Sequence, residues 1–107
     1  MKNNPNPGFQ SLAFDIGAES GRAISGSFNG DILSLNEVHR FSNGPVRVGN
    51  HLHTDILNIW QQIQIGLSKS FQESQQSILS VGVDTWGVDY ALLDRNNQLL
   101  GNPYHYR

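Results

Sequence analysis

The stretch VGVDTWGVDY, residues 81–90, decides most of what the sequence says about the fold. It begins with alternating valine and glycine, becomes polar at Asp84, and places Trp86 directly before Gly87. An apolar run that stops at Asp, with Gly close behind, is typical of a buried strand at its carboxyl end. A second stretch, LAFDIGAESGR at 12–22, repeats this plan. The sequence therefore predicts two strand ends of the same kind.

The composition is that of one small domain. The chain has 107 residues, a formal net charge of −2 and no cysteine. This length suits a single domain with a modest core. Because the charge is near neutral and neither Lys nor Arg forms a run, we expect no nucleic-acid partner. The first ten residues lack the apolar segment of a signal peptide, and no apolar run is long enough to cross a bilayer. We expect a soluble, cytoplasmic chain that does not bind a membrane.

The first half of the chain predicts a β-meander. Residues 1–10 are rich in Pro and Asn and are expected to form a disordered lead-in, with order beginning near Ser11. Asn29-Gly30 is a strong hairpin signal. It stands between strands expected at 22–28 and 31–41, which follow the first strand in antiparallel order.

A loop and an amphipathic helix are expected next. Residues 43–53 are rich in turn formers and predict a loop. Thr54 is a suitable N-cap, and the helix is expected over about 55–75. Its apolar residues recur at helical spacing and predict one buried face, formed by Ile56, Trp60, Ile63, Leu67 and Phe71.

Two further strands complete the order βββαββ, one over SILSVGVD (77–84) and one over VDYALLD (88–94). This order predicts an α/β architecture in which a mixed sheet is covered by one helix. Strands this apolar are usually covered on both faces, yet the sequence supplies only one helix. Met1 is typical of a true start, so we expect the N-terminal piece of a larger protein that continues beyond Arg107.

The turn after the first strand has the composition of an anion-binding hairpin. Gly17 can take backbone angles closed to other residues, which lets the N–H groups that follow point inward as a nest. Ser20 can add a hydroxyl and Arg22 a positive charge. Asp15 ends the strand and can hold Mg²⁺ through water, because this ion prefers oxygen ligands. The alternative is an ordinary tight hairpin whose Asp and Ser only cap the turn.

The second turn suits a small polyhydroxy ligand. If the strand after the helix is the parallel neighbour of the first strand, their carboxyl ends open onto one crevice, and Asp15 and Asp84 face one cavity. The ring of Trp86 offers a flat face and an N–H, and Gly87 lets the backbone approach a ligand. The alternative for Trp86 is a core residue or a lid over the end of the helix.

The remaining ionisable residues form no recognisable catalytic set. His51 and His53 are two residues apart and could face one metal ion, but without a third ligand a loop is the favoured interpretation. The others are expected to be unpartnered or structural: His39 in a strand, His105 near the end, and Asp89 and Asp94 as turn or edge residues.

Four stretches together resemble the start of a sugar kinase of the FGGY family, within the actin-like, ribonuclease-H-like ATPase superfamily. They are DIGAESGR, EVHRFSNGPV, VGVDTWGVDYALLD and GNPYHYR. The resemblance spans about 12–107 and implies that residues 11–107 are the first part of the family's N-terminal domain. It also implies transfer of the γ-phosphate of Mg-ATP to the 1-hydroxyl of L-rhamnulose, in the breakdown of L-rhamnose.

The resemblance implies roles for particular residues. Gly87 corresponds to a sugar-contacting glycine with Trp86 beside it, and Asp15 lies near the Mg²⁺. The ATP phosphates are met by the hairpin residues Ala18, Glu19, Ser20, Gly21 and Arg22. The family's catalytic Asp and adenosine pocket lie in later segments, so no catalytic residue is expected up to Arg107. Thr54 departs from the family, which often carries Trp at this position.

Two alternatives stay open. The first is an FGGY kinase for another sugar, such as L-fuculose. The second is a non-catalytic actin-like module that holds nucleotide without transferring phosphate. The sequence after Arg107 would discriminate between them, because a kinase continues with an Asp-containing polar turn and a later Asp-x-Gly phosphate loop.

Overall fold

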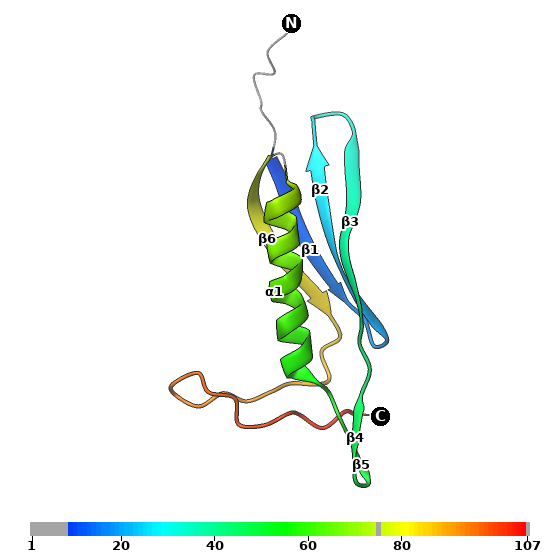
Figure 1. Cartoon of the computed structure of the whole chain (residues 1–107), viewed down its shortest axis with the longest axis vertical. Helices are drawn as coiled ribbons and strands as arrows, with labels where there is room; N and C mark the ends of the chain where they lie inside the picture. Colours follow the sequence, from blue (N-terminus) through cyan, green and yellow to red (C-terminus); the bar gives the residue numbers. More distant parts are fainter. Residues whose placement is uncertain (1–8, 75, 107) are drawn as a thin grey trace, which may run out of the picture.

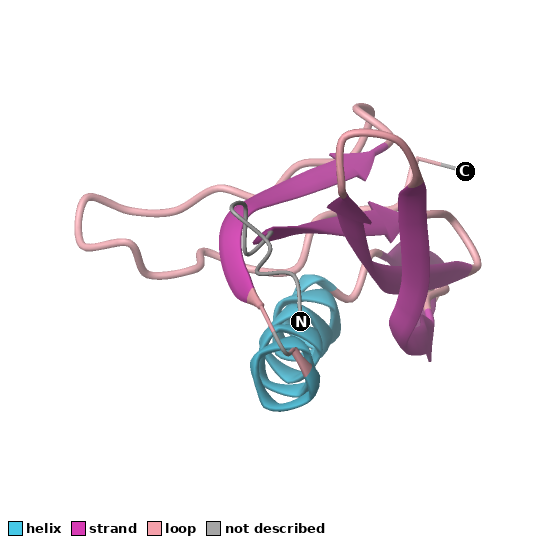
Figure 2. Ribbon diagram, turned by 90° about the horizontal axis from the view of Figure 1, so that it is seen from above, coloured by secondary structure: helices cyan, strands magenta, loops and turns pink. Residues whose placement is uncertain are grey.

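The computed structural model describes residues 9–74 and 76–106 and shows a four-stranded mixed sheet with a helix on one face (Figures 1 and 2). The strands lie in the order β3-β2-β1-β6. Their bounds are Phe9–Ile16 for β1, Ser20–Phe28 for β2, Leu33–Ser42 for β3 and Ser77–Thr85 for β6. The first three are antiparallel, and β6 pairs in parallel with β1. The predicted α/β class, with its mixed sheet, is confirmed.

The meander forms as the sequence predicts, with small shifts at its ends. β1 begins at Phe9, so this residue and Gln10 belong to the sheet and not to the lead-in, whose other residues lie outside the described ones. At the β2–β3 turn, Gly30 has a φ of 97°. The side-chain oxygen of Asn29 accepts the N–H groups of Asp31 and Ile32 at 2.9 and 2.8 Å. The Asn-Gly hairpin is therefore confirmed.

The segment predicted as a loop over 43–53 contains a small ribbon instead. β4 (Val46–Val48) pairs antiparallel with β5 (His51–His53), and Gly49 between them has a φ of 60°. Strands of three residues are too short to show a period of two in the sequence, so the pattern predicted only turn structure.

The helix α1 covers Ile56–Glu73, and its N-cap is Asp55. The Asp55 carboxylate accepts the N–H of Asn58 at 3.2 Å. The prediction of Thr54 as the cap was wrong, because its hydroxyl is directed to a different partner, described below. Neither Asp nor Thr is disfavoured at an N-cap, so the sequence alone did not separate the two.

The core lies between α1 and the first three strands. Its buried apolar side chains are Leu12, Phe14, Ile16, Ala23, Phe41 and Ile59. The helix approaches the sheet at Gly66, where a β-carbon would lie 2.7 Å from Phe14 Cε1. The fully buried residues of the helix are Ile59, Gly66 and Ser70, none of which belongs to the predicted face. Ile63 and Leu67 pack against the core as expected, but Trp60 and Phe71 are exposed.

Among the described residues, the last predicted strand, over 88–94, does not join the sheet. Residues 90–102 form an extended arm that leaves the sheet beyond β6 (Figure 1). The arm folds back on itself through a bridge between Leu93 and Leu99 and a hydrogen bond from Leu100 N to Leu92 O of 3.0 Å. It pairs with itself and not with β6, so the order βββαββ is corrected to βββ, a ribbon, α1 and β6.

Candidate functional site

The two turns singled out in the sequence follow neighbouring strand ends. β1 and β6 are parallel and in register, with Asp15 opposite Asp84 and Ile16 opposite Thr85. A narrow crevice between the turns is lined by Ala18 of the first and Trp86 of the second, with Asn43, Gly44, Pro45, Thr54 and His105. The predicted parallel pairing of the two strands is confirmed and brings both turns to one edge of the sheet. A ligand crevice between the turns stays a prediction.

The two aspartates do not line this crevice. Side chains alternate along a strand, and the buried residues of β1 on either side of this position, Phe14 and Ile16, face α1. Asp15 and its neighbour Asp84 therefore lie on the opposite face of the sheet. The prediction that both carboxylates face the cavity between the strand ends was wrong, because the two side chains share the exposed face of the sheet.

The first turn is held by a residue that the sequence analysis missed. Asn43 is buried, donates its backbone N–H to Glu19 O at 2.8 Å and its side-chain amide to Gly17 O at 2.7 Å. Gly17 N donates to Ser20 O at 2.9 Å and has no positive φ. Glycine is suited to this position because a β-carbon would lie 3.2 Å from Ser20 O, so crowding and not a left-handed backbone explains it. The Asn-Gly pair that follows β3 was the available signal for this clamp.

The five residues expected to meet ATP phosphates fall into two groups. Ala18 and Glu19 form the tip of the turn, and the other three, Ser20, Gly21 and Arg22, begin β2. Because β2 lies between β1 and β3, Gly21 is paired with Ile16 on one side and Phe41 on the other. Because Ser20 and Gly21 are paired in the sheet, the predicted nest of consecutive N–H groups stays a prediction for Ala18 and Glu19 alone. A β-carbon on Gly21 would collide with the Phe41 ring.

Charged side chains gather on the sheet face opposite α1. Arg22 stands across from Asp15 in the β1–β2 register, with 3.8 Å between Nε and Oδ2. Arg40 lies beside Arg22 in β3 and binds Glu37 at 2.7 Å. The hydrogen bond from Arg40 lowers the pKa of the Glu37 carboxyl. This face therefore carries charges of both signs, with ion pairs between β1 and β2 and within β3.

The second turn contains one packed residue and one open residue. Trp86 is partly buried and packs against the core, as the alternative interpretation of a core residue predicted. It also lines a cavity of about 220 Å³ between the start of α1 and residues 89–91. Gly87 is exposed, and a β-carbon there would meet nothing within 4 Å. Gly87 therefore leaves space beside its backbone for a ligand.

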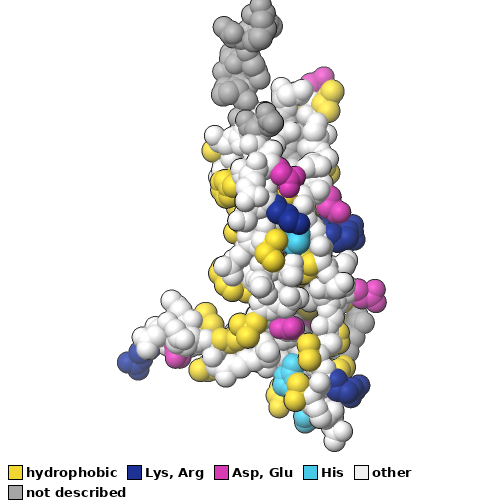
Figure 3. Space-filling model, viewed as in Figure 1, with side chains coloured by type: hydrophobic (Ala, Val, Ile, Leu, Met, Phe, Trp, Pro, Cys, Tyr) yellow, Lys and Arg dark blue, Asp and Glu magenta, His cyan; other side chains and the backbone are white. Residues whose placement is uncertain are grey.

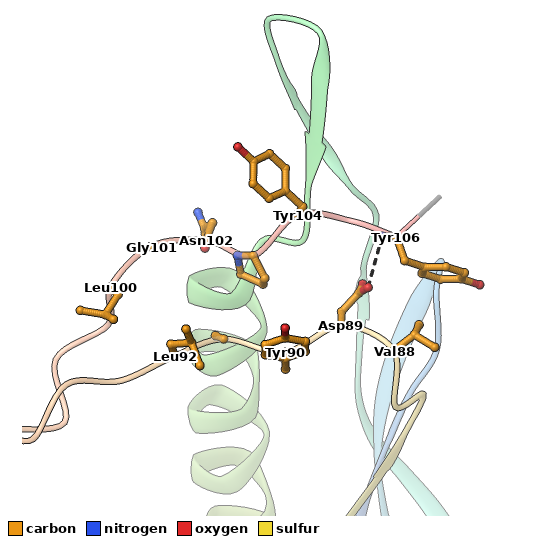
Figure 4. A pocket seen from close by; sticks show the side chains of 11 residues that line it. Val88, Asp89, Tyr90, Leu92, Leu100, Gly101, Asn102, Tyr104 and Tyr106 are labelled. Atoms are coloured by element: carbon orange, nitrogen blue, oxygen red, sulfur yellow. Dashed lines mark hydrogen bonds between the residues drawn. The ribbon is translucent and has the colours of Figure 1, made fainter.

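Asp89 is the centre of a buried polar junction, and its prediction as a turn or edge residue was wrong. Its Oδ2 accepts the hydroxyl hydrogen of Thr54 at 2.7 Å and lies 3.3 Å from His105 Nδ1. Its Oδ1 accepts the backbone N–H of Tyr106 at 3.2 Å (Figure 4). His105, expected to be unpartnered, thus has a carboxylate partner. Asp94 does serve a turn, since it accepts the N–H groups of Asn96 and Gln98.

Residues 103–105 run along the β4–β5 ribbon. His105 N donates to Leu52 O at 2.8 Å, and Thr54 N donates to Pro103 O at 2.9 Å. The ring of Tyr104 stacks on His53 with centroids 4.7 Å apart and meets His51 edge-on at 5.3 Å. These histidines are packing partners, and within residues 9–74 and 76–106 no three ionisable side chains are grouped as metal ligands.

A larger cavity opens beside Asp89. It has a volume of about 360 Å³ and lies between residues 88–92 and 100–104, with Tyr106 at one side (Figure 4). Its lining is mainly aliphatic and aromatic.

Among the described residues, no helix is long and apolar enough to span a membrane.

The fold of the chain is one that solved sugar kinases share. The chain superposes on a gluconate kinase and on a ligand-bound xylulose kinase, both from Lactobacillus acidophilus, each with a TM-score of 0.72. The superpositions include 91% and 90% of this chain, respectively, and 19% of each kinase. At 13% identity the likeness shows the fold alone. No family model matches the chain.

In sequence, the particular kinases that the chain is similar to are rhamnulokinases. It is 46% identical over 96 residues to the rhamnulokinase of Bacteroides thetaiotaomicron and 44% identical over 96 residues to that of Oceanobacillus iheyensis. Each match covers 90% of this chain and 20% of the relative. The chain thus spans about a fifth of the length of these relatives. The resemblance to a sugar kinase that its motifs predicted is confirmed.

Proposed function

We propose that this chain forms one wall of the active cleft of a rhamnulokinase, which transfers the γ-phosphate of ATP to the 1-hydroxyl of L-rhamnulose in the breakdown of L-rhamnose. The observation that carries the proposal is the identity of 41–46% with rhamnulokinases over about nine tenths of the chain. The parallel pairing of β1 with β6 supports it, because it brings the two turns to one crevice. Such an enzyme would work in the cytoplasm, where ATP is available.

The phosphate side of the proposed cleft is the β1–β2 turn. Its tip, Ala18 and Glu19, offers backbone N–H groups, and Ser20 offers a hydroxyl at the start of β2. Position 21 requires glycine because a β-carbon there would collide with the ring of Phe41. Arg22 supplies a positive charge near the turn. The buried Asn43 clamps the turn and would fix these donors in advance of binding.

Mg²⁺ suits the carboxylates at the ends of β1 and β6. Asp15 and Asp84 are in-register neighbours on an exposed sheet face, so their oxygens could hold a hydrated ion together. Mg²⁺ usually keeps several of its waters and takes only one or two carboxylates. The bound ion would neutralise charge on the ATP phosphates. These residues fit that ion without a dedicated cage of protein ligands.

The sugar side of the proposed cleft is the Trp86–Gly87 turn. The backbone at Gly87 has free space beside it, and Trp86 anchors the turn by packing against the core. In phosphoryl transfer, positioning and charge neutralisation provide most of the rate enhancement. A wall without a catalytic base can therefore still be essential. The group that accepts the proton of the sugar hydroxyl is proposed to lie outside these residues.

A chimeric enzyme tests the proposal. Residues 1–107 would replace the matching fifth of the Bacteroides thetaiotaomicron rhamnulokinase, and ADP release would be followed with L-rhamnulose, L-fuculose and D-xylulose. We expect sugar-dependent turnover with L-rhamnulose preferred, and an increased KM for ATP in Ser20→Ala with the KM for sugar unchanged. A shift of preference to L-fuculose would indicate another kinase. A folded chimera that binds ATP and transfers no phosphate would support a binding module and overturn the proposal.

A further inference from the structure

Asp89 joins three segments that are far apart along the chain. Thr54, which precedes α1, lies 35 residues away, and Tyr106 lies 17 residues away. The side chains of Asp89 and His105 are only 5% and 7% exposed. A buried carboxylate is costly unless it is fully hydrogen-bonded, and this one has donors on both oxygens. The arrangement is therefore a built junction and not an incidental surface contact.

The hydrogen-bond pattern defines the protonation of the junction. Thr54 gives its hydroxyl hydrogen to Asp89, so its oxygen is free to accept from His105 Nδ1, 3.1 Å away. Nδ1 must then carry a hydrogen whether or not the ring is charged. Burial raises the pKa of Asp89, but the hydrogen bond from Thr54, the nearby indole N–H of Trp86, His105 and the Tyr106 N–H together lower it below its ordinary value. Asp89 is thus ionised at neutral pH.

The junction lies directly behind the second turn. Asp89 is two residues after Gly87 and three after Trp86, and it lines the same 220 Å³ cavity as the indole. Thr54 and His105 line the narrow crevice together with Trp86 and Ala18. Fixing Asp89 against Thr54, His105 and Tyr106 therefore also fixes the turn against the start of α1 and against the crevice.

We propose that Asp89 is a positioning residue for sugar binding, which holds the Trp86–Gly87 turn in the orientation that the sugar requires. The role in sugar binding rests on the proposed kinase function, whereas the holding of the turn rests on the contacts alone. Substitution of a merely structural residue would lower the stability of the fold and leave the ratio of the sugar affinity to the ATP affinity unchanged. A positioning residue raises the KM for sugar selectively.

Hydrogen exchange on the full chain tests the holding of the turn. The variants are Asp89→Ala and Asp89→Asn, with Asp94→Asn as the matched control, because Asp94 caps a local turn in the same region and joins no distant segments. We expect the Tyr106 amide to exchange about ten-fold faster in Asp89→Ala, less so in Asp89→Asn, and at the original rate in the control. Amides of β1 and β2 should not change. Unaltered exchange at Tyr106 in both Asp89 variants would overturn the proposal.

Kinetics of the chimeric enzyme test the selective effect on sugar. We expect Asp89→Asn to raise the KM for L-rhamnulose about ten-fold with the KM for ATP unchanged, and the Asp94 control to alter neither. Equal changes in both KM values, or a loss of kcat alone, would show that Asp89 does not position the sugar-binding turn. If the unsubstituted chimera phosphorylates no sugar, the kinase function and the sugar-binding role both fail, and the exchange rate of the Tyr106 amide still decides whether Asp89 holds the junction together.

Discussion

Asp15 and Asp84 are in-register neighbours across the parallel strands β1 and β6, and their side chains lie on the sheet face opposite α1. Because the strands are parallel and in register, the turns that follow the two residues begin at the same level. This relationship brings Ala18 and Trp86 to one crevice, although they are 68 positions apart in the sequence.

Gly87→Ala is predicted to weaken sugar binding without weakening the fold. The added methyl group meets nothing in the chain within 4 Å and would occupy the space proposed for the sugar. In the chimeric enzyme, kcat/KM for L-rhamnulose should fall by about 1–3 kcal/mol, the range typical of overpacking. Gly82→Ala, equally unobstructed within β6, is the control and should alter neither substrate. A weaker affinity for ATP with the sugar unaffected would reverse the assignment of the two turns.

Gly66→Ala is predicted to destabilise the fold, although alanine is the better helix former by about 1 kcal/mol. Its β-carbon would lie 2.7 Å from Phe14 Cε1 and 3.2 Å from Ala23 Cβ, at the closest approach of α1 to the sheet. We expect a net loss of about 1–2 kcal/mol in the free energy of unfolding, measured by urea denaturation. Gly44→Ala, which meets no atom within 4 Å, should be nearly neutral. A stabilised Gly66→Ala would show that the helix can move away from the sheet at little cost.

Acid is predicted to destabilise the chain partly through Asp89. Its pKa is lowered in the folded protein from an ordinary value of 3.8, so its ionised form stabilises the fold above that value. This contribution is lost as the pH falls below about 4 and through the folded pKa. The free energy of unfolding should decline more steeply in the wild type than in Asp89→Asn over this range. Parallel curves for the two proteins would show that Asp89 has no linkage to folding.

The 107-residue chain by itself is predicted to bind a hydrophobic dye. Leu79, Val81 and Val83 of β6 are largely exposed, since α1 lies over the other strands, and apolar side chains also gather along the arm (Figure 3). Contiguous exposed apolar patches on a protein commonly mark interaction surfaces. Dye fluorescence should rise on addition of the chain and fall in the double variant Val81→Thr and Val83→Thr. A sharp melting transition without dye binding would contradict the expectation of an uncovered apolar surface.

Local patterns in the sequence were sufficient for the main elements of the fold. Asn29-Gly30 specifies a hairpin by its backbone angles, and the apolar runs before Asp15 and Asp84 specify two strands. The spacing of apolar residues specifies α1, because a period of 3.6 over eighteen residues is hard to mistake. The parallel pairing of the first and last strands followed from the connecting helix. From these features alone, the position of the two turns at one edge of the sheet could be predicted.

Tertiary contacts decided the rest, because they join residues that no local pattern relates. Gly66 packs against the ring of Phe14 on the facing strand while Trp60 is exposed, and the apolar spacing alone did not predict this choice of buried face. Asn43 holds the first turn from the end of β3. Asp89 has the same sequence surroundings as any turn aspartate, and only folding brings Thr54 and His105 to it. The sequence by itself determined which segments become strands and helix, since backbone angles and apolar periodicity are local. Which polar groups are buried together was decided by the packing of segments 17 to 51 residues apart.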